Sequence, residues 1–278
     1  MASQRLAVIT GASSGIGYEL ARCAIESGFD LLIAANEPAI HQAGQRLERH
    51  AAGLKDETRR SAPVIDTLEV DLATAAGVER LCGYVGARPV ELLAANAGVG
   101  LGSAFLEEDL GDINRMIATN VLGTVHLVHR LGRRMATRGS GRILITGSIA
   151  GTFPGPYHAV YSATKAFLNS FAQAVRAELE NSGVTVTCLM PGATETQFFR
   201  RAGLLDTKIG SSRKATAASV AQRGFTAALN GKADIVTGIG NKVRALIAKL
   251  TPAETMAKRY RPKARPRGLV PRDKARAT

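Results

Sequence analysis

The chain has 278 residues, 45% apolar and 21% charged, which is enough apolar material for a core and too much for a disordered chain. No apolar run approaches the roughly 18 residues that span a bilayer, and the N-terminus lacks a secretory signal pattern. Three scattered cysteines (Cys23, Cys82, Cys188) suggest neither a disulfide framework nor a zinc cluster. We therefore exclude secreted, membrane-spanning and metal-finger classes and expect a cytoplasmic protein.

The net charge of +13 is concentrated at the C-terminus. Residues 258–278 carry nine basic side chains and the single acid Asp273, so this segment holds +8 and the rest of the chain about +5. The segment also contains three prolines and few large apolar residues, which predicts a disordered extension. A basic segment can bind nucleic acid or an anionic surface. Because the body is only mildly basic, we do not expect nucleic acid as a partner.

Short apolar runs alternate along the chain with longer stretches of helical pattern. The predicted strands are Leu6–Thr10, Phe29–Ala35, Ile65–Leu72, Val90–Asn96, Arg142–Thr146, Val184–Met190 and Asp234–Thr237, and the clearest helical stretches are Gly17–Ser27, Asp109–Thr137 and Tyr161–Ser182. Runs such as LLIAA are almost continuously apolar, as expected of parallel strands covered on both faces. The pattern predicts an α/β fold, a doubly wound and mostly parallel sheet of about seven strands. We expect one catalytic domain over residues 1–250 and a basic, flexible tail over 251–278.

A glycine-rich turn, Gly11-Ala12-Ser13-Ser14-Gly15-Ile16-Gly17, follows the first strand and leads directly into a helical pattern. Glycine allows a tight turn and close approach to a phosphate, and the helix N-terminus offers free N–H groups to a pyrophosphate. The spacing is GxxxGxG and not the common GxGxxG. The segment could also be an ordinary strand-to-helix turn, but its position after the first strand favours a dinucleotide site.

The end of the second strand bears on the choice of cofactor. An acidic residue there binds the ribose 2′-hydroxyl of NAD(H), whereas a basic residue accepts the 2′-phosphate of NADP(H). Ala35 stands at the expected acidic position, and Asn36 could donate a hydrogen bond to a phosphate. An inward-pointing Glu37 carboxylate would oppose the binding of that phosphate. We favour NADP(H) and keep NAD(H) as possible.

Tyr161 and Lys165 stand four residues apart, which places them on one face of a helix. An ammonium beside a phenol stabilises the phenolate and lowers a pKa that is about 10 unperturbed, so the tyrosine becomes a usable proton donor or acceptor. The same spacing also describes an ordinary exposed aromatic and cation.

Further polar residues stand where strands end, at the edge where open α/β sheets bind ligands. Ser148 follows the fifth strand, and Asn96-Ala97-Gly98 the fourth. Asn120 lies inside the long helical pattern, where an asparagine indicates a kink or a held water, or is an ordinary surface residue.

Together these segments resemble the short-chain dehydrogenase/reductase family, a Rossmann-fold family, from about Arg5 to Gly238. The resemblance implies a catalytic tetrad of Asn120, Ser148, Tyr161 and Lys165. It also implies cofactor contacts, which are Gly11, Ser13, Ser14, Gly15, Ile16, Gly17, Asp71, Leu72, Asn96, Ala97, Gly98, Tyr161, Lys165, Pro191, Gly192, Thr194 and Thr196. Ala35 and Asn36 join this set from the argument on the second strand. Two departures are Ala95, where the family often has asparagine, and Thr194, where an aliphatic residue is common.

The resemblance implies an oxidoreductase that interconverts a carbonyl and a primary or secondary alcohol. Tyr161 would donate a proton to the substrate oxygen or take one from it, and Ser148 would hold that oxygen. Lys165 would lower the Tyr161 pKa and hold the nicotinamide ribose, and Asn120 would anchor a water. The hydride chemistry belongs to the cofactor. The resemblance also implies a homodimer or homotetramer.

Other segments carry open alternatives. Phe198, Phe199, Leu204 and Leu205, within residues 196–213, would line an apolar substrate pocket or pack as core. Pro154, Tyr157 and His158 stand in the implied substrate loop. His126 and His129 have a metal-ligand spacing, but with no third ligand in view we expect no metal.

Residues 241–250 form a helical stripe through Val243, Leu246, Ile247 and Leu250. With the basic tail it could dock on an anionic membrane, and we favour packing on the body or on a partner subunit. The alternative function is a catalytically silent binding protein acting through the tail on nucleic acid or an anionic membrane.

Overall fold

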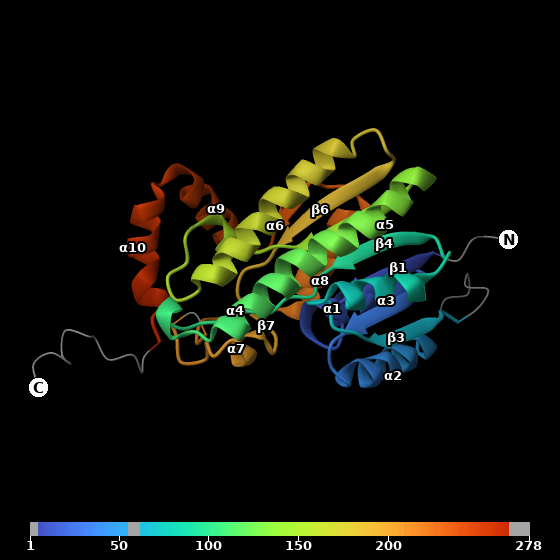
Figure 1. Cartoon of the computed structure of the whole chain (residues 1–278), viewed down its shortest axis with the longest axis horizontal. Coiled ribbons are helices and arrows are strands. Elements are labelled where there is room, and N and C mark those ends of the chain that lie inside the picture. The colour runs from blue at the N-terminus through green and yellow to red at the C-terminus, as the bar shows by residue number, and fades with distance from the viewer. Residues whose placement is uncertain (1–4, 55–61, 209, 267–278) are drawn as a thin grey trace, which may run out of the picture.

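Seven parallel strands form the central sheet in the order β3-β2-β1-β4-β5-β6-β9, in a computed structural model that describes residues 5–54, 62–208 and 210–266 (Figure 1). The strands are β1 (Leu6–Thr10), β2 (Asp30–Ala35), β3 (Ile65–Glu69), β4 (Val90–Ala95), β5 (Gly141–Thr146), β6 (Val184–Met190) and β9 (Asp234–Val236). The doubly wound α/β prediction is confirmed, and every predicted strand is present. The order reverses between β1 and β4, the position at which such sheets open a ligand crevice.

Helices cover both faces of the sheet. One face packs against α1 (Gly15–Glu26), α2 (Ala39–Ala52) and α8 (Ala217–Leu229), and the other against α3 (Ala75–Val85), α5 (Thr124–Arg138) and α6 (Ala159–Glu178). Successive strand residues point to opposite faces, so Val8 joins one apolar core and Ile9 the other. This double coverage explains why the strands are continuous apolar runs.

The predicted helix Asp109–Thr137 has a change of pitch near its middle. It consists of α4 (Leu110–Ile117), a π-helical turn η2 (Ala118–Gly123) and α5. Asn120 lies in the turn and is fully buried, so the predicted kink is confirmed at that residue. Gly123 lets the turn approach the sheet, because a Cβ there would lie 2.2 Å from the Leu72 carbonyl oxygen.

A small unit follows β6, built from the short strands β7 (Thr194–Glu195) and β8 (Ala215–Thr216) and the helical turn α7 (Phe198–Arg201). Its own apolar cluster contains Phe199, Ala202 and Leu204, with Phe198 packed partly against it. Phe199 and Leu204 are therefore core residues of this unit, whereas Leu205 is exposed. Two short helical turns, η1 (Phe105–Glu107) and η3 (Ile149–Thr152), precede α4 and α6.

The chain continues past β9 into α9 (Ile239–Leu250) and α10 (Ala253–Ala264) at one end of the molecule (Figure 1). The prediction of a flexible tail from residue 251 is therefore wrong over α10. The helix is held because the Tyr260 ring packs on Phe153 with ring centroids 4.7 Å apart, and Ala264 is buried. Residues 267–278, which carry the rest of that prediction, lie outside the described residues.

We favoured packing of the apolar stripe of α9 on the body or on a partner subunit. The structure does not show packing on the body. Val243, Leu246, Ile247 and Leu250 are all exposed. Within the described ranges, no helix is both long enough and apolar enough to cross a membrane.

Candidate active site

The four tetrad candidates converge beyond the carboxyl ends of β4 and β5. Lys165 Nζ donates to the carbonyl oxygen of Thr146 at 2.8 Å and lies 5.9 Å from the centre of the Tyr161 ring. Asn120 Nδ2 donates to the hydroxyl of Thr164, the neighbour of Lys165, at 3.0 Å. The structure thus brings together residues from η2, the loop after β5 and α6 that the sequence separates.

Ser148 is held by its main chain as well as by its side chain. Its N–H donates to Asn169 Oδ1 at 3.3 Å, and its carbonyl accepts from Asn169 Nδ2 at 2.9 Å. Its hydroxyl accepts from the Ala150 N–H at 3.0 Å. Asn169 was not predicted; the signal for it is its place one turn after Lys165 on the same face of α6.

Burial shifts the Tyr161 and Lys165 pKa values in opposite directions. It lowers the pKa of Lys165 to about 8 and raises the pKa of Tyr161 to about 12, with a smaller opposing effect from the Ser148 hydroxyl. The expected lowering of the Tyr161 pKa by Lys165 is therefore not found in this structure, because desolvation is the larger effect. The phenol is protonated at neutral pH and can act as a proton donor.

Asn120 closes the site from the side of the long helix. Its Oδ1 accepts from the Val99 N–H at 2.9 Å, and its Nδ2 donates to the Val99 carbonyl, also at 2.9 Å. A Cβ on Gly98 would lie 3.2 Å from Asn120 Oδ1 and 3.4 Å from Lys165 Nζ. The segment after β4 therefore runs between the asparagine and the lysine.

The glycine turn has the geometry that a pyrophosphate needs. Gly11 and Gly15 have φ values of 64° and 60°, and a Cβ on Gly17 would lie 2.3 Å from the Gly11 carbonyl oxygen. The side chain of Ser14, the residue before α1, caps no described amide, and the first turn of α1 has no acidic residue. A cavity of about 440 Å³ opens beside Ser14, Gly15 and Thr196, and Glu19 and Glu195 also line it. The residues present thus fit a bound dinucleotide.

The end of β2 holds a charge cluster. Glu37 points inward and accepts a hydrogen bond from the Ser13 hydroxyl. Arg201 Nη2, from α7, donates to both Glu37 carboxylate oxygens at 3.1 and 3.0 Å. The Ser13 hydrogen bond, followed by Arg201, lowers the pKa of Glu37 below its usual value. Ala35 is buried and Asn36 exposed, and Arg46 donates to the Ser13 carbonyl at 3.3 Å.

Asn96 braces the strand ends. Its Nδ2 donates to the Thr10 carbonyl at 3.0 Å and its Oδ1 accepts from the Thr146 hydroxyl at 3.0 Å. The side chain thereby ties together the ends of β1, β4 and β5. The N–H groups of Asn96 and Ala97 both donate to the Thr10 hydroxyl at 3.0 Å, which fixes the main chain at the start of this segment.

The two remaining candidate cofactor segments are held by local hydrogen bonds. Asp71 Oδ2 accepts from Arg115 at 3.0 Å, and its Oδ1 accepts from the Ala73 N–H at 3.0 Å. After β6, the Pro191 carbonyl accepts from the Ile149 N–H at 3.1 Å. The buried Thr194 hydroxyl donates to the Gly192 carbonyl at 3.0 Å.

Aromatic side chains lie near the tetrad. The Phe198 ring is 5.1 Å from that of Tyr161, centre to centre. The Phe153 ring, in the loop before α6, packs on the Tyr260 ring of α10. Tyr260, on α10, was not predicted because composition alone suggested a tail. His158 is buried, and burial lowers the pKa of its imidazole. Tyr157 has a φ of 61°, a strained conformation for a non-glycine residue.

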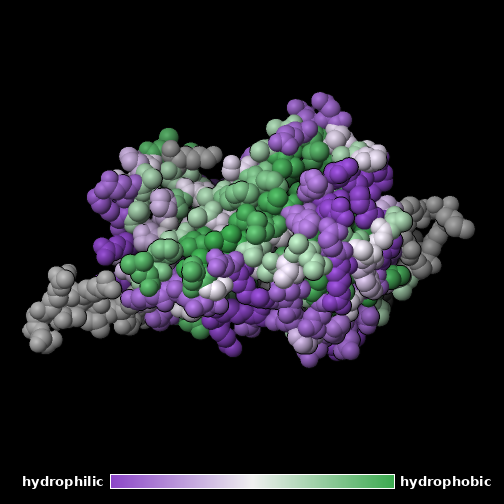
Figure 2. Space-filling model, viewed as in Figure 1, coloured by the Kyte–Doolittle hydropathy of each residue, from purple (hydrophilic) through white to green (hydrophobic). Residues whose placement is uncertain are grey.

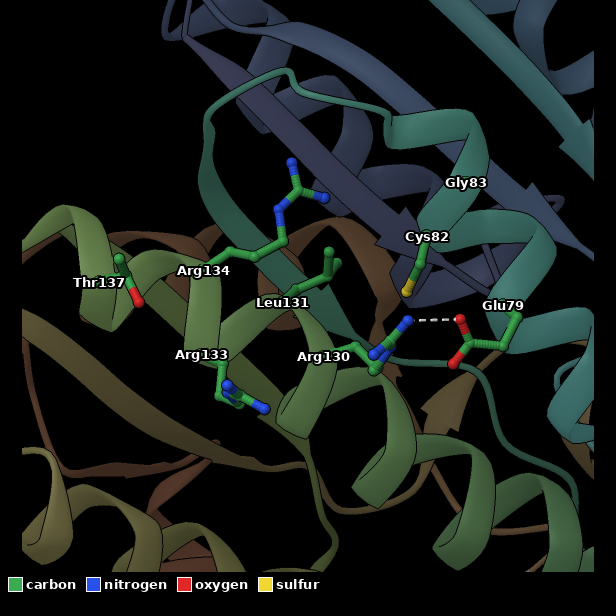
Figure 3. A pocket seen from close by; sticks show the side chains of 8 residues that line it. All are labelled: Glu79, Cys82, Gly83, Arg130, Leu131, Arg133, Arg134 and Thr137. Atoms are coloured by element: carbon green, nitrogen blue, oxygen red, sulfur yellow. Dashed lines mark hydrogen bonds and ion pairs between the residues drawn. The ribbon is translucent and has the colours of Figure 1, made fainter.

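A separate cavity of about 590 Å³ lies between α3 and α5, and no tetrad or cofactor candidate lines it. Arg130 bridges the two helices by donating to Glu79 at 2.7 Å (Figure 3). His126 also contacts Glu79, at 2.9 Å. The described residues contain no cluster of three or more metal-ligating side chains.

Comparison with known proteins identifies related chains. Residues 5–204 match the family described as short chain dehydrogenase. The chain is 36% identical over 196 residues to sulfoacetaldehyde reductase of Chromohalobacter salexigens, and the matched region covers 68% of this chain and 72% of that protein. It is 34% identical over 197 residues to an uncharacterized oxidoreductase of Myxococcus xanthus, covering 70% and 74%.

A solved structure shares the fold. A short-chain dehydrogenase from Sphingobium yanoikuyae in complex with NADPH superposes with a TM-score of 0.76 at 24% identity, covering 88% of this chain and 93% of that one. The doubly wound sheet, with a tyrosine and a lysine at its strand ends, defines an NAD(P)(H)-dependent oxidoreductase of carbonyl and alcohol groups. The chain belongs to the short chain dehydrogenase family. The predicted family, fold and reaction class are confirmed.

Proposed function

We propose that this enzyme interconverts a carbonyl compound and its alcohol with NADP(H) in preference to NAD(H), and that Tyr161 is the general acid/base. The convergence of Tyr161, Ser148 and Lys165 at the strand ends is the observation that carries this proposal.

When bound, the dinucleotide supplies the hydride to the carbonyl carbon, or accepts it from the alcohol. In the reducing direction Tyr161 donates its phenolic proton to the substrate oxygen, and the Ser148 hydroxyl holds that oxygen. Lys165, whose pKa is about 8, is the adjacent group that can return a proton to Tyr161. Asn120 holds the Val99 main chain and Thr164, and so fixes the walls of the site.

Each cofactor segment has a proposed role. The turn Gly11–Gly17, with Ser13, Ser14, Gly15 and Ile16, holds the pyrophosphate and the adenosine ribose. Asp71 and Leu72 border the adenine, and Asn96, Ala97 and Gly98 line the crevice floor. Lys165 and Tyr161 hold the nicotinamide ribose, and Pro191, Gly192, Thr194 and Thr196 cover the nicotinamide.

The NADP(H) preference rests on charge around Ser13. Glu37 alone would repel a 2′-phosphate, but Arg201 neutralises its carboxylate. Arg46 approaches the Ser13 carbonyl from α2, so a phosphate beside Ser13 would meet two guanidinium groups. The small Ala35 leaves room for it, and exposed Asn36 can add a hydrogen bond. The Sphingobium yanoikuyae relative is described with NADPH bound.

We infer that the substrate is a small molecule with apolar substituents. Phe198 packs on Tyr161, and Phe153 and Tyr260 add a second aromatic wall. Aromatic faces bury apolar groups more favourably than polar ones. An assay panel of aliphatic and aromatic ketones and aldehydes should include sulfoacetaldehyde, the compound named for one relative.

We also propose that the enzyme is a homo-oligomer. A band of hydrophobic surface crosses α6 and the adjoining part of the α4–α5 segment (Figure 2). Ile117, Leu122 and Phe167 are exposed there. Exposed apolar patches of this kind mark subunit interfaces. Sedimentation velocity on wild type and Phe167→Asp tests this proposal, and a monomeric wild type would contradict it.

A cytoplasmic location is proposed because all three cysteines are free. No observation favours nucleic acid as a partner or a catalytically silent binding protein, since the tetrad is complete.

The test compares wild type with Tyr161→Phe, using Tyr84→Phe, an exposed tyrosine on α3, as the matched control. Fluorescence titration measures NADPH and NADH binding, and cofactor oxidation measures turnover across the panel. We expect all three proteins to bind NADPH more tightly than NADH and only Tyr161→Phe to lose turnover. The proposal is wrong if Tyr161→Phe retains full turnover, or if wild type binds neither cofactor.

A further inference from the structure

Helix α9 turns its small residues inward and its large apolar residues outward. Ala245 and Ala248 face the body and are buried. Five large apolar side chains of the same helix, between 45% and 82% exposed, form its outer face; they are Ile239, Val243, Leu246, Ile247 and Leu250. We call these five residues the α9 stripe. A helix that packs only on its own body has the opposite arrangement.

The orientation of α9 is fixed by contacts at its start. Asn241 Nδ2 donates to the Thr237 carbonyl at 2.7 Å. Asn241 also lies against Gly192, where a Cβ would come within 2.1 Å of its Nδ2. These contacts, with the buried Ala245 and Ala248, hold the α9 stripe toward solvent. Helices α9 and α10 form one end of the molecule (Figure 1).

Cations flank the α9 stripe and continue into α10. Lys242 and Arg244 are exposed at its two edges, since they lie on opposite sides of the apolar arc of the helix. From 239 to 266 the sequence has eight Lys and Arg residues and a single acid, Glu254, which pairs with Lys258. On α10, Arg259, Arg261 and Lys263 are exposed.

We propose that α9 is an interfacial membrane helix that docks on a bilayer of anionic lipids. The α9 stripe would enter the boundary between headgroups and acyl chains, and the flanking cations would contact lipid phosphates. This would make the enzyme a peripheral membrane protein whose binding depends on both apolar burial and lipid charge.

Charge selects a lipid surface over a second copy of this chain. Two copies joined through the α9 stripe would bring two strongly basic segments together, and like charges at close range repel. An anionic leaflet instead attracts the same cations, with about a fivefold gain in affinity for each charge near the surface.

The experiment is vesicle co-sedimentation of the full chain without substrate. Vesicles contain phosphatidylcholine alone or with about one third phosphatidylglycerol, and the variants are Leu246→Asp and Lys242→Gln. Val64→Asp is the control, since Val64 is an exposed apolar residue outside α9. NADPH binding and thermal melting verify that each variant is folded.

We expect wild type and Val64→Asp to bind the anionic vesicles and to bind pure phosphatidylcholine far more weakly. Leu246→Asp should weaken binding at least tenfold, and Lys242→Gln about fivefold. If Leu246→Asp binds as wild type does, the basic segment alone attracts lipid and the interfacial helix is refuted. If Leu246→Asp instead converts a dimer to a monomer in sedimentation velocity, the α9 stripe is a subunit interface. Because vesicle binding is read without turnover, its failure leaves the proposed reaction untouched.

Discussion

Arg201 offers the sharpest test of how this site recognises its cofactor. The residue lies on α7, remote in sequence from the turn and strand that we propose hold the adenosine ribose. In the structure it reaches across to Glu37 with two hydrogen bonds, of 3.0 and 3.1 Å, beside Ser13. We predict that Arg201→Ala raises the KM for NADPH and leaves the KM for NADH nearly unchanged.

The magnitude follows from charge and exposure. A hydrogen bond to a charged group contributes about 1.5–3 kcal/mol when well formed. The Arg201 side chain is about half exposed, so solvent screening reduces this to roughly 1–2 kcal/mol, a factor of about 5 to 30 in KM. The variant also leaves the Glu37 carboxylate without its cation, which adds repulsion toward a 2′-phosphate. Stability should change by less than about 1 kcal/mol, because the ion pair is exposed.

Steady-state kinetics with both cofactors gives the ratio of the KM for NADPH to the KM for NADH. Arg200→Ala is the control, from the same helical turn. Arg200 is also exposed and basic, so a general loss of positive charge would affect both variants equally. Glu37→Gln should act in the opposite direction and lower the KM for NADPH. The reasoning is refuted if Arg201→Ala raises the two KM values equally, since Arg201 would then only hold α7 in place.

Three further predictions concern the tetrad and its walls. Asn169→Ala should lower kcat about tenfold with little change in the KM for NADPH, because Asn169 holds the main chain of Ser148 and the buried Cys188 thiol, and neither is a proposed cofactor contact; an unchanged kcat would contradict this. Tyr260→Ala should change the KM for bulky ketones and not that for NADPH, and equal changes in both would mean that α10 acts globally. Lys165→Met should lose activity but gain about 1–3 kcal/mol of stability at pH 7 in denaturant titrations, because burial lowers the Lys165 pKa to about 8. From about pH 8 to 10.5 the unfolded wild type binds a proton that the folded chain lacks, so its free energy of unfolding should rise with pH over that range, and the variant should lack this rise.

Strands and the tetrad were accessible from the sequence because both are local signals. A run such as Val184–Met190 is apolar over its whole length and bounded by a turn, so its limits coincide with β6. Tyr161 and Lys165 share one helix face at a fixed spacing. The polar residues at strand ends could be grouped because parallel strands deliver their carboxyl ends to one edge.

The features that were missed depend on pairs far apart in the chain. Arg201 meets Glu37 across 164 residues, and no local pattern marks that pair. Composition suggested disorder after residue 250, yet Tyr260 finds Phe153 and the segment becomes helical. The outward direction of Leu246 also depends on packing, because an amphipathic pattern does not say which face a body covers.

The Tyr161 and Lys165 pKa values show why the pair suits proton transfer. Burial favours the neutral form of each group, so the resting site holds a phenol whose pKa is about 12 beside an ammonium whose pKa is about 8. When Tyr161 gives its proton to a substrate oxygen, a phenolate forms close to that ammonium. Their attraction is strong in surroundings of low polarity and exists only once the proton has moved. We therefore propose that the lowering of the Tyr161 pKa that the motif implies arises along the reaction and not in the resting site, so that Lys165 would stabilise the transition state.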